Sequence, residues 1–396
     1  MTTTRWPLVR LEEVVAEALP GFAVGERDPH GVVQLRMNNV DTQGHLNWSD
    51  YVRVPATSGM ISKYRLLSGD VVFNNTNSTA LVGKSARFAG YAEPVVYSNH
   101  FTRLRPVPDR LDSAYLAAWL LRLWQQHTFE DLCNRWIGQS AVNREKLLAL
   151  EIPLPSVSVQ RRIVAKLDEQ MSALDRAEKA LAGQQATASI LATAVLQHAL
   201  NETESPHWPQ VRLGDMMESD LQQVSPDDDS AAGLSYVGME DIESQTGRII
   251  AQSTQRVIRS NTFVFDEHHV LYGKLRPYLN KVALPESRGR CSTELIPLLP
   301  KAGTDRRYLA WLLRRPETVS AAMQEKTGSR MPRASMQSVM QLHVPLPPLS
   351  QQKQIARSLD QAHANLAVFS ERVADQEASL VALRITLLDA AFSGEI

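Results

Sequence analysis

One segment of this chain occurs twice, and it constrains the fold more than any other feature of the sequence. Residues 152–168 are IPLPSVSVQRRIVAKLD and residues 344–360 are VPLPPLSQQKQIARSLD, identical at eight of seventeen positions with a constant offset of 192. The prolines that open each copy favour extended backbone and are excluded from a helix interior. The polar residues that follow, with Gln160 and Gln352 in the first turns, favour helix. Each copy is therefore predicted to be a short extended segment that leads into a long helix.

The duplication extends beyond this segment. Residues 6–11, WPLVRL, recur as residues 208–213, WPQVRL, and YLAAW at 115–119 is similar to YLAWL at 308–312. A chain of 396 residues is also too long for one ordinary core. We therefore predict two similar globular domains, each followed by a helical region, with the boundaries 1–151, 152–206, 207–343 and 344–396.

Each globular domain is predicted to have a mixed α/β fold. Short apolar runs between Gly, Asn and Pro are typical of strands, and they occur at 32–35, 70–73, 95–97, 234–237, 269–272 and 282–284. Helix-favouring runs predict helices at 112–129, 140–148, 304–314 and 317–326. The same order of elements in both domains supports one fold that is used twice.

The helical regions carry a seven-residue apolar repeat. In the second region it runs through Leu359, Leu366, Val373, Leu380 and Leu387, interleaved with Ile355, Ala362, Phe369, Gln376, Leu383 and Ala390. In the first it runs through Leu167, Leu174, Leu181, Ala188 and Val195, interleaved with Ile163, Gln170, Ala177, Gln184, Leu191 and His198. Such spacing predicts a coiled coil. We expect the two helices to pair antiparallel within the chain, about a pseudo-two-fold axis; the alternative is that each helix packs only on its own domain.

The net charge of −1 hides two regions that are rich in basic residues. Residues 53–146 contain 12 Lys and Arg against 7 Asp and Glu, and residues 248–333 contain 16 against 7. Residues 211–247 instead hold one Arg and nine acidic residues. Local basic surfaces on a nearly neutral chain suit contact with phosphates in two places, although ordinary solvated surface gives the same counts.

Motifs for catalysis and for cofactor binding are missing from the sequence. We find no GxGxxG after a strand, no GxxxxGK[ST], GxSxG or HExxH, and no Asn-Pro-Pro-aromatic segment. Cys133 and Cys291 lack CxxC partners, which disfavours a zinc site or a disulfide framework and favours a reducing, cytoplasmic location. No apolar run approaches the ~20 residues of a membrane span, and the first ten residues form no apolar signal core. We expect neither catalytic nor metal-binding residues in this chain.

Polar and basic segments follow the second predicted strand of each domain. They contribute Asn74, Asn75, Thr76, Asn77, Ser78, Lys84 and Arg87 in the first domain, and Lys274, Arg276, Tyr278 and Lys281 in the second. A Gly-led loop before the last short helix of each domain adds Gln139, Ser140 and Asn143, and Ser329, Arg330 and Arg333. Asn pairs with adenine, and Lys and Arg bind guanine or phosphate. We predict that these residues contact duplex DNA; for any single one, an exposed loop without function is the alternative.

The chain resembles the specificity subunit of type I restriction–modification systems. The resemblance is carried by the two I/V-P-L-P…Q…I…L-D segments, the WPxVRL domain starts and the final LDAAFSGEI at 388–396, and it covers essentially the whole chain. It implies two target-recognition domains, 1–151 and 207–343, that each recognise one half of a bipartite DNA site. It also implies that the paired helices set the spacer between the half-sites.

The resemblance implies partners as well. Two methyltransferase subunits, which bind S-adenosylmethionine and methylate adenine, are expected to dock on the helical regions. Restriction subunits that translocate and cleave unmodified DNA with ATP and Mg²⁺ are expected to join them. The specificity subunit itself is expected to be non-catalytic. Because the segments at 74–79 and 273–276 differ, the two domains are expected to recognise different sequences.

Two other classes of function remain open. One is a coiled-coil scaffold whose α/β domains bind protein, which neutral apolar patches would favour, whereas basic surfaces favour DNA. The other is a self-sufficient methyltransferase or nuclease, which the missing motifs disfavour.

Overall fold

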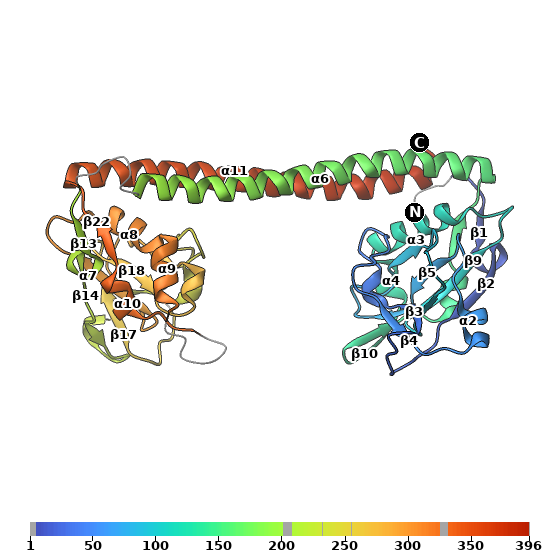
Figure 1. The fold of residues 1–396 in the computed structure, drawn as a ribbon, viewed down its shortest axis with the longest axis horizontal. Coiled ribbons are helices and arrows are strands. Elements are labelled where there is room, and N and C mark those ends of the chain that lie inside the picture. The colour runs from blue at the N-terminus through green and yellow to red at the C-terminus, as the bar shows by residue number, and fades with distance from the viewer. Residues whose placement is uncertain (1–4, 201–207, 232, 255, 325–331, 396) are drawn as a thin grey trace. The chain divides into compact units, whose positions relative to one another are not determined.

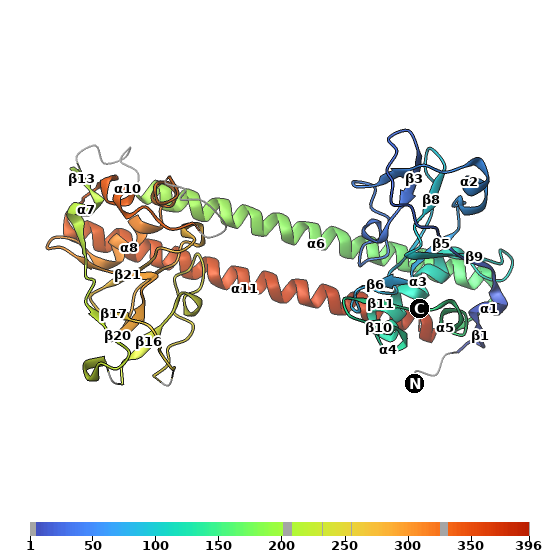
Figure 2. The same ribbon diagram turned by 90° about the horizontal axis from the view of Figure 1, so that it is seen from below.

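The structure is a computed structural model that describes residues 5–200, 208–231, 233–254, 256–324 and 332–395. The described residues form two compact units, each with one α/β domain and parts of two long helices. Unit 1 lies within residues 1–181 and 375–396, and unit 2 within residues 182–374 (Figures 1 and 2). No helix in the described ranges combines the length and the apolar character that crossing a membrane requires.

Unit 1 consists of small sheets with helices packed on them (Figure 1). Its strands are β1 (Leu8–Arg10), β2 (Val15–Pro20), β3 (Val32–Leu35), β4 (Val52–Val54), β5 (Val71–Asn74), β6 (Thr76–Asn77), β7 (Ser85–Arg87), β8 (Val95–Tyr97), β9 (Phe101–Pro106), β10 (Asn134–Trp136), β11 (Gln139–Ala141) and β12 (Glu151–Pro153). Its short helices are α1 (Leu11–Val14), α2 (Ser58–Tyr64), α3 (Ser113–Gln125), α4 (Thr128–Leu132) and α5 (Arg144–Leu148), with a 3-10 turn at Met37–Asn39. The long helices are α6 (Val157–Leu200) and α11 (Leu349–Ser393).

The central sheet of unit 1 has the strand order β2-β9-β5-β7, with every pair antiparallel. A second sheet, β4-β3-β8, contains the parallel pair β3–β8. Successive side chains of a strand point to opposite faces, and β5 buries both. Val71 and Phe73 join the core that includes α3, whereas Val72 joins the core of β3 and β8. This two-sided burial connects the sheets into one domain.

Unit 2 repeats this arrangement. Its strands are β13 (Gln210–Arg212), β14 (Met217–Ser219), β15 (Gln223–Val224), β16 (Ser235–Val237), β17 (Thr262–Phe265), β18 (Val270–Gly273), β19 (Val282–Ala283), β20 (Gly289–Ser292), β21 (Leu295–Pro300) and β22 (His343–Pro345). Its short helices are α7 (Leu213–Met216), α8 (Arg306–Arg314), α9 (Pro316–Ala322) and α10 (Met336–Gln341), with 3-10 turns at Asp229–Ala231, Met239–Asp241 and Pro277–Leu279. The sheet β14-β21-β18-β19 corresponds to β2-β9-β5-β7, and the sheet β15-β17-β20-β16 again contains one parallel pair, β16–β20.

The two recurring motifs of the sequence pair with each other in each unit. β1, from the first WPxVRL segment, is antiparallel to β12, with Val9 opposite Ile152. β13 is antiparallel to β22 in the same way, with Val211 opposite Val344. The proline-rich segment is therefore the last strand of each domain, and a long helix begins a few residues later. The predicted extended segment that leads into a helix is confirmed in both copies.

A buried glutamine fixes the start of α6. The side-chain oxygen of Gln160 accepts a hydrogen bond from the backbone N–H of Asp112 at 2.8 Å. Its Nε2 donates to the carbonyl oxygens of Arg110 and Pro155 at 2.9 Å. Asp112 in turn caps the N-terminus of α3. One glutamine thus ties the long helix to a helix of the domain.

Gln352 makes the equivalent contacts at the start of α11. Its side-chain oxygen accepts from the backbone N–H of Asp305 at 2.8 Å, and Asp305 caps α8. Its Nε2 donates to the carbonyl oxygens of Gly303 and Pro347 at 2.9 and 2.8 Å. The duplication is therefore preserved down to single hydrogen bonds.

The end of α11 completes the core of unit 1. The Phe392 ring is buried, with its centroid 4.8 Å from that of Tyr115 and 4.9 Å from that of Trp119, both on α3. In unit 2 the end of α6 does the same, because Leu200 joins the core that contains Tyr308 of α8. Each domain therefore packs on the start of one long helix and on the end of the other.

The helices run antiparallel in unit 1. Arg384 contacts Asp175 and Glu178 of α6, whereas Phe392, further along α11, lies in the core with Ile163, further back along α6. This confirms the antiparallel pairing and shows that the helices pack on the domains as well as on each other.

Only part of the predicted seam is buried. Leu167, Leu174 and Leu181 are at most 9% exposed. Leu191 and Leu383, from the interleaved row of the heptad repeat, are 61% and 45% exposed, so the repeat is not buried at every position. A helix that packs on a single partner buries only a narrow stripe of its surface.

Two predicted helices differ from the structure. The helix expected at 112–129 is divided into α3 and α4, because His127 adopts a left-handed backbone conformation with φ of 59°. The helix expected at 140–148 begins only at Arg144, since Ser140 lies in β11 and Asn143 caps α5. In unit 2, α9 already ends at Ala322, and the last residues of the helix predicted at 317–326 lie outside the described residues.

Candidate nucleic-acid interface

Two polar segments that are far apart in the sequence meet in a small sheet of unit 1. β6 pairs with β11, with Asn77 opposite Ser140, and β11 forms a hairpin with β10. Thr79 Oγ1 and Ser140 Oγ are 2.8 Å apart and share a hydrogen bond. The backbone N–H of Val142 donates to the carbonyl oxygen of Asn75 at 2.9 Å. The structure thus joins the predicted DNA-contacting segments of the first domain into one surface.

Three of the predicted contact residues are buried within that domain. Asn74, Lys84 and Ser140 are 0%, 8% and 1% exposed. Asn74 Nδ2 donates to the carbonyl oxygen of His100 at 2.9 Å, and Lys84 Nζ donates to that of Val40. Burial lowers the pKa of Lys84. These side chains use their polar atoms inside the domain, so a direct contact with DNA does not fit their burial.

The segment Asn75 to Asn77 is half-buried and held by side-chain hydrogen bonds. Asn75 Nδ2 donates to Thr102 Oγ1 at 3.0 Å, and Asn75 Oδ1 accepts from Thr76 Oγ1 at 2.8 Å. Asn77 Oδ1 accepts from the backbone N–H of Ser78 at 2.8 Å. The network fixes the conformation of this segment and presents Ser78 to solvent.

The remaining predicted residues of unit 1 are exposed, but some of them also make hydrogen bonds within the domain. Gln139 is exposed on β11. Arg87 is exposed but its Nε donates to Ser113 Oγ at 2.9 Å. Asn143 is exposed and its side-chain oxygen accepts from a backbone N–H of α5 at 2.8 Å. Gln139 and Ser78 therefore have the side chains best placed to contact a ligand.

Unit 2 builds an equivalent surface around Lys274 and Arg333. Leu275 and Arg333 form an antiparallel bridge, and the backbone N–H of Arg276 donates to the carbonyl oxygen of Pro332 at 2.8 Å. As in unit 1, the segment that follows a central strand pairs with the segment that precedes the last short helix. The same construction therefore occurs in both repeats, although the side chains differ.

The predicted residues of unit 2 are more exposed than their counterparts. Tyr278 is 49% exposed, and Lys274 is half-buried. Arg276 has a left-handed backbone conformation, with φ of 53°. Lys281 Nζ donates to a backbone carbonyl at 2.7 Å, and Arg333 is ion-paired with Glu294 at 2.9 Å. Two predicted residues, Ser329 and Arg330, lie outside the described residues.

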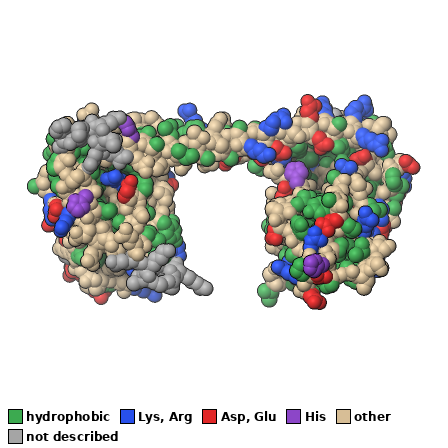
Figure 3. All heavy atoms as spheres, in the orientation of Figure 1, with side chains coloured by type: hydrophobic (Ala, Val, Ile, Leu, Met, Phe, Trp, Pro, Cys, Tyr) green, Lys and Arg blue, Asp and Glu red, His purple; other side chains and the backbone are tan. Residues whose placement is uncertain are grey.

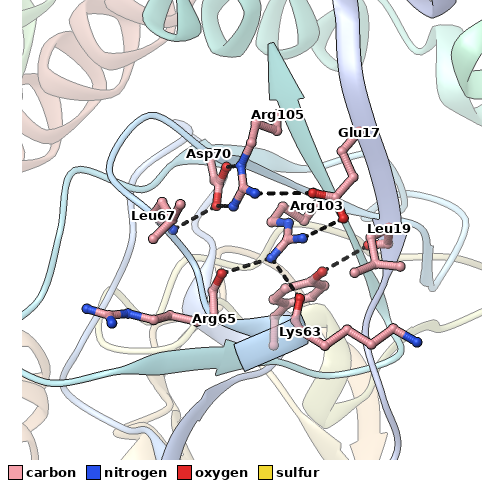
Figure 4. Close-up of polar contacts among 9 residues, drawn as sticks. Glu17, Leu19, Lys63, Arg65, Leu67, Asp70, Arg103 and Arg105 are labelled. Atoms are coloured by element: carbon pink, nitrogen blue, oxygen red, sulfur yellow. Dashed lines mark hydrogen bonds and ion pairs between the residues drawn. The ribbon is translucent and has the colours of Figure 1, made fainter. Parts of the chain in front are cut away.

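Part of the basic excess in the first domain is internal. Arg103 is 2% exposed and donates to Glu17 at 2.7 Å and to the carbonyl oxygen of Arg65 at 2.8 Å (Figure 4). Arg105 donates to both carboxylate oxygens of Asp70, at 2.7 and 2.8 Å. The hydrogen bond to Asp70 raises the pKa of Arg105. These ion pairs join β2 and β9 to Asp70, the residue before β5, instead of facing a ligand.

The surface charge is consequently mixed. In Figure 3, Lys and Arg side chains lie among Asp and Glu on the visible face of the molecule. In unit 2, Arg314 also points inward, since its Nη2 donates to the carbonyl oxygens of Thr246 and Val282 at 2.9 and 2.7 Å. Burial lowers the pKa of Arg314 to about 10. The charge counts of the sequence therefore overstate how basic the two surfaces are.

The hairpin of β10 and β11 carries residues that the sequence analysis missed. Trp136 is 61% exposed, and Ile137 is fully exposed. Arg135 and Arg144, nearby in the sequence, are exposed too. The signal was present in the segment NRWIGQ, where an aromatic and a β-branched residue precede a glycine turn between polar residues.

No metal centre accompanies these surfaces in the described ranges, where no three His, Cys, Asp or Glu side chains are arranged to hold an ion. His269 is 5% exposed. Its ring nitrogens lie 2.7 Å from Asp266 Oδ1 and 3.3 Å from Asp220 Oδ2, so it bridges two loops of unit 2.

The fold and these surfaces define a class of protein with duplicated recognition domains, in which each domain is joined to a long helix. The model of the family described as type I restriction modification DNA specificity domain matches residues 38–182 and 207–371, well over half of the chain. The chain therefore belongs to the type I restriction–modification DNA specificity family.

Curated relatives match shorter stretches. A Methanocaldococcus jannaschii protein named as a type I restriction enzyme MjaX specificity subunit is 30% identical over 131 residues, 31% of each chain. The type I restriction enzyme EcoDI specificity subunit of Escherichia coli is 29% identical over 157 residues, 39% of this chain and 35% of that protein. The matched stretches thus span about a third of the length of these relatives.

Two solved structures share the fold along the whole chain. One, from work on complex assembly and conformational transition of the type I restriction–modification system, has a TM-score of 0.75 and 22% identity, and each chain is covered completely. The HsdS subunit from Thermoanaerobacter tengcongensis has a TM-score of 0.57 and 21% identity, covering 99% of this chain and 97% of that one. At these identities the likeness concerns the fold.

Proposed function

We propose that this chain is the DNA sequence-specificity subunit of a type I restriction–modification complex. The observation that carries the proposal is the surface built twice from the same two segments, β6 with β11 in unit 1 and Leu275 with Arg333 in unit 2. Both surfaces lie in regions matched by the DNA specificity family. Each would recognise one half of a bipartite duplex site, and their different side chains imply different half-sites.

In this proposal the long helices have two roles. They set the length of the spacer between the half-sites, and they dock two methyltransferase subunits. Exposed apolar side chains on α6 and α11 support the docking role, among them Ile190, Leu191 and Val381, which are 72%, 61% and 57% exposed. In the proposed complex a docked methyltransferase subunit would cover these side chains.

Chemistry is assigned to the partner subunits. The methyltransferase subunits would bind S-adenosylmethionine and methylate adenine, and the restriction subunits would use ATP and Mg²⁺. The chain itself would act without catalysis, in the cytoplasm, where it directs these enzymes to a sequence. The absence of catalytic motifs from the sequence supports this division of labour.

Methylome mapping tests the proposal most directly. Cells that express the chain with its methyltransferase partner should contain methylated adenines in one bipartite sequence, and cells without the chain should lack them. Gel shifts of the same complex on mixed-sequence DNA should weaken steeply with salt, because phosphate contacts release counterions. If DNA binding is missing even at low salt, the protein-binding scaffold becomes the better explanation.

A variant in unit 2 tests the assignment of the surface. Lys274→Ala should weaken binding to all sequences and reduce the salt slope by about one, as expected for one lost phosphate contact. Lys353→Ala is the matched control, because this lysine is exposed on α11 in the same unit. Equal affinities for the Lys274→Ala variant and the parent protein would remove this segment from the interface.

A further inference from the structure

The tip of the β10–β11 hairpin is apolar and unusually exposed. We call Trp136 and Ile137 the hairpin tip; they are 61% exposed and fully exposed, respectively. Gly138 makes the turn with φ of 78°, and a side chain there would touch nothing within 4 Å. Figure 1 places β10 on the side of unit 1 that lies opposite α6 and α11. The tip therefore contributes nothing to the core, and folding does not explain its composition.

The hairpin is held firmly behind this tip. β11 is paired on both sides, with β10 and with β6. Lys146 Nζ donates to the carbonyl oxygen of Leu132 at 2.7 Å and to Asn134 Oδ1 at 3.1 Å. Arg135 Nη2 donates to the carbonyl oxygen of Glu130 at 2.9 Å. A projecting apolar pair on a rigid base has the form of a wedge.

We propose that the hairpin tip inserts into a base step of duplex DNA beside the half-site contacted by unit 1. The inference rests on the proposed function and adds to it the element that deforms the DNA. The Trp136 indole would stack on an unstacked base, and Ile137 would fill the space opened between the base pairs. Apolar side chains used in this way unstack a step and bend the duplex.

Two observations favour DNA over a protein as the occupant. First, Gln139 is an exposed polar residue that lies opposite Trp136 in the hairpin, on the strand that pairs with β6. The residues that would contact bases and the hairpin tip that would act as the wedge therefore belong to one sheet. The tip also offers only two apolar side chains, whereas a stable protein interface buries some 20 residues on each side. A wedge of this size matches a single base step.

The wedge predicts a feature of the recognised sequence. Pyrimidine–purine steps such as TA and CA unstack most easily. We therefore expect one such step within or next to the half-site of unit 1. Replacing its base pairs should weaken binding, although the protein makes no hydrogen bond to those bases.

The test uses the full chain, assembled with its modification subunits, and a duplex that carries the methylated sequence found by methylome mapping. Single 2-aminopurines are placed in turn at each step across and beside both half-sites. The target adenines are left unlabelled, because methyltransferases flip their target base out of the duplex. At the other positions, binding of the parent complex should raise 2-aminopurine fluorescence several-fold at one step. Trp136→Ala with Ile137→Ser should abolish that rise and weaken binding about tenfold, the scale of one lost base–aromatic stack. Trp136→Phe should retain the rise.

Controls separate the possible results. Leu67→Ser alters another exposed apolar residue of unit 1, 48% exposed, and should change neither signal nor affinity. If the parent complex binds and no step responds, or the double variant keeps the response, the wedge is refuted while the proposed function stands. If the double variant instead fails to assemble with the modification subunits on a sizing column, the tip is a protein contact. Failure of the parent complex to bind any DNA refutes both proposals.

Discussion

The buried glutamines at the starts of α6 and α11 show how much one side chain can do in this fold. Gln160 satisfies one backbone donor and two backbone acceptors where the domain meets the start of α6. Leaving such groups unpaired costs more than the net value of the hydrogen bonds, since each loses its solvation. The side-chain amide of glutamine supplies both the acceptor and the donor that these contacts use, whereas an ionised glutamate only accepts and a lysine only donates.

Replacing either glutamine should destabilise its own unit. Gln160→Ala and Gln352→Ala should each lower the free energy of unfolding by about 2–4 kcal/mol, because three backbone groups lose their partner. Urea unfolding followed by circular dichroism measures the loss. Gln354→Ala, on an exposed position of α11, is the control and should lie within about 0.5 kcal/mol of the parent. Equal losses for Gln352→Ala and Gln354→Ala would contradict the assigned role.

His363 of α11 is expected to make unit 2 sensitive to acid. The ring of His363 lies 5.5 Å from that of Trp311, edge to face. Burial and the charge of Arg314 lower the pKa of His363, although Asp360 and Glu243 act in the opposite direction. The unfolded chain, with a histidine pKa near 6.5, therefore binds the proton more readily than the folded one. Stability is full above that pH and is lost as the pH falls toward the lowered pKa.

Thermal unfolding between about pH 5 and pH 8 tests this linkage. The parent protein should lose stability as the pH falls below about 6.5, and His363→Gln should lose less over the same interval. His343→Gln, at an exposed position of β22, should behave like the parent. A His363→Gln profile that matches the parent in slope would show that other groups cause the acid sensitivity.

Single residues were also where the sequence was hardest to interpret. The run from Asn74 to Ser78 is uniformly polar, yet Asn74 is buried and Ser78 is exposed. Burial there depends on the carbonyl of His100, which the tertiary fold supplies and local composition does not indicate. The burial of Lys84 is not indicated by local composition either, because its Nζ reaches a carbonyl of Val40 in a distant loop.

At the scale of elements, a buried arginine couples the two long helices in unit 1. Arg384 of α11 is 6% exposed, and its Nη2 lies 2.7 Å from Asp175 Oδ1 and 3.1 Å from Glu178 Oε1 of α6. These contacts raise the pKa of Arg384 against the effect of its burial. A buried charge with partners at fixed positions penalises any shift of one helix along the other.

Removing that charge should weaken the pairing of the helices. Arg384→Ala should destabilise unit 1 by about 3 kcal/mol, at the lower end for a broken buried ion pair because both carboxylates keep partial access to water. Arg372→Ala, exposed on the same helix, should have an effect within about 0.5 kcal/mol. Denaturant unfolding measures the free energy of unfolding of both variants. Similar values would show that the contacts of Arg384 do not stabilise the pairing of the helices.

Helices and strands were predicted well where the local sequence determines them and poorly where a distant segment does. The strands at 32–35 and 95–97 match β3 and β8 at both ends, since each is a β-branched run between turn residues. The hairpin of β10 and β11 was missed because β11 is stabilised by β6, more than 60 residues away in the sequence. Heptad spacing identified both long helices but could not show that the domains, too, pack on them.

For the whole molecule, duplication was the property that the sequence specified best. The repeated motifs turned out to be strands that pair with each other, and the repeated glutamines to make matching contacts. Two domains of one fold with different surface residues are suited to a target with two different halves. The proposed function therefore follows from the architecture more than from any single residue.

Lengthening both helices tests the proposed role of the spacer. Seven residues in heptad register are inserted after Leu181 in α6 and after Ala374 in α11, at the boundaries between the units. Seven helical residues add about 10 Å, equivalent to roughly three base pairs of DNA. The methylome of cells with this variant should show a longer spacer between unchanged half-sites. An unaltered spacer would mean that the helices do not set the distance.

The end of each long helix lies beside the start of a repeat. In unit 2 the end of α6 leads through residues 201–207 into the second repeat at Trp208. In unit 1 the end of α11 reaches the same place beside the first repeat, where a Cβ on Gly394 would lie 3.1 Å from Arg5 Cβ. Arg5 and Gly394, near opposite ends of the described residues in the sequence, therefore lie against each other in unit 1, so a larger side chain at Gly394 should disturb the start of the first repeat.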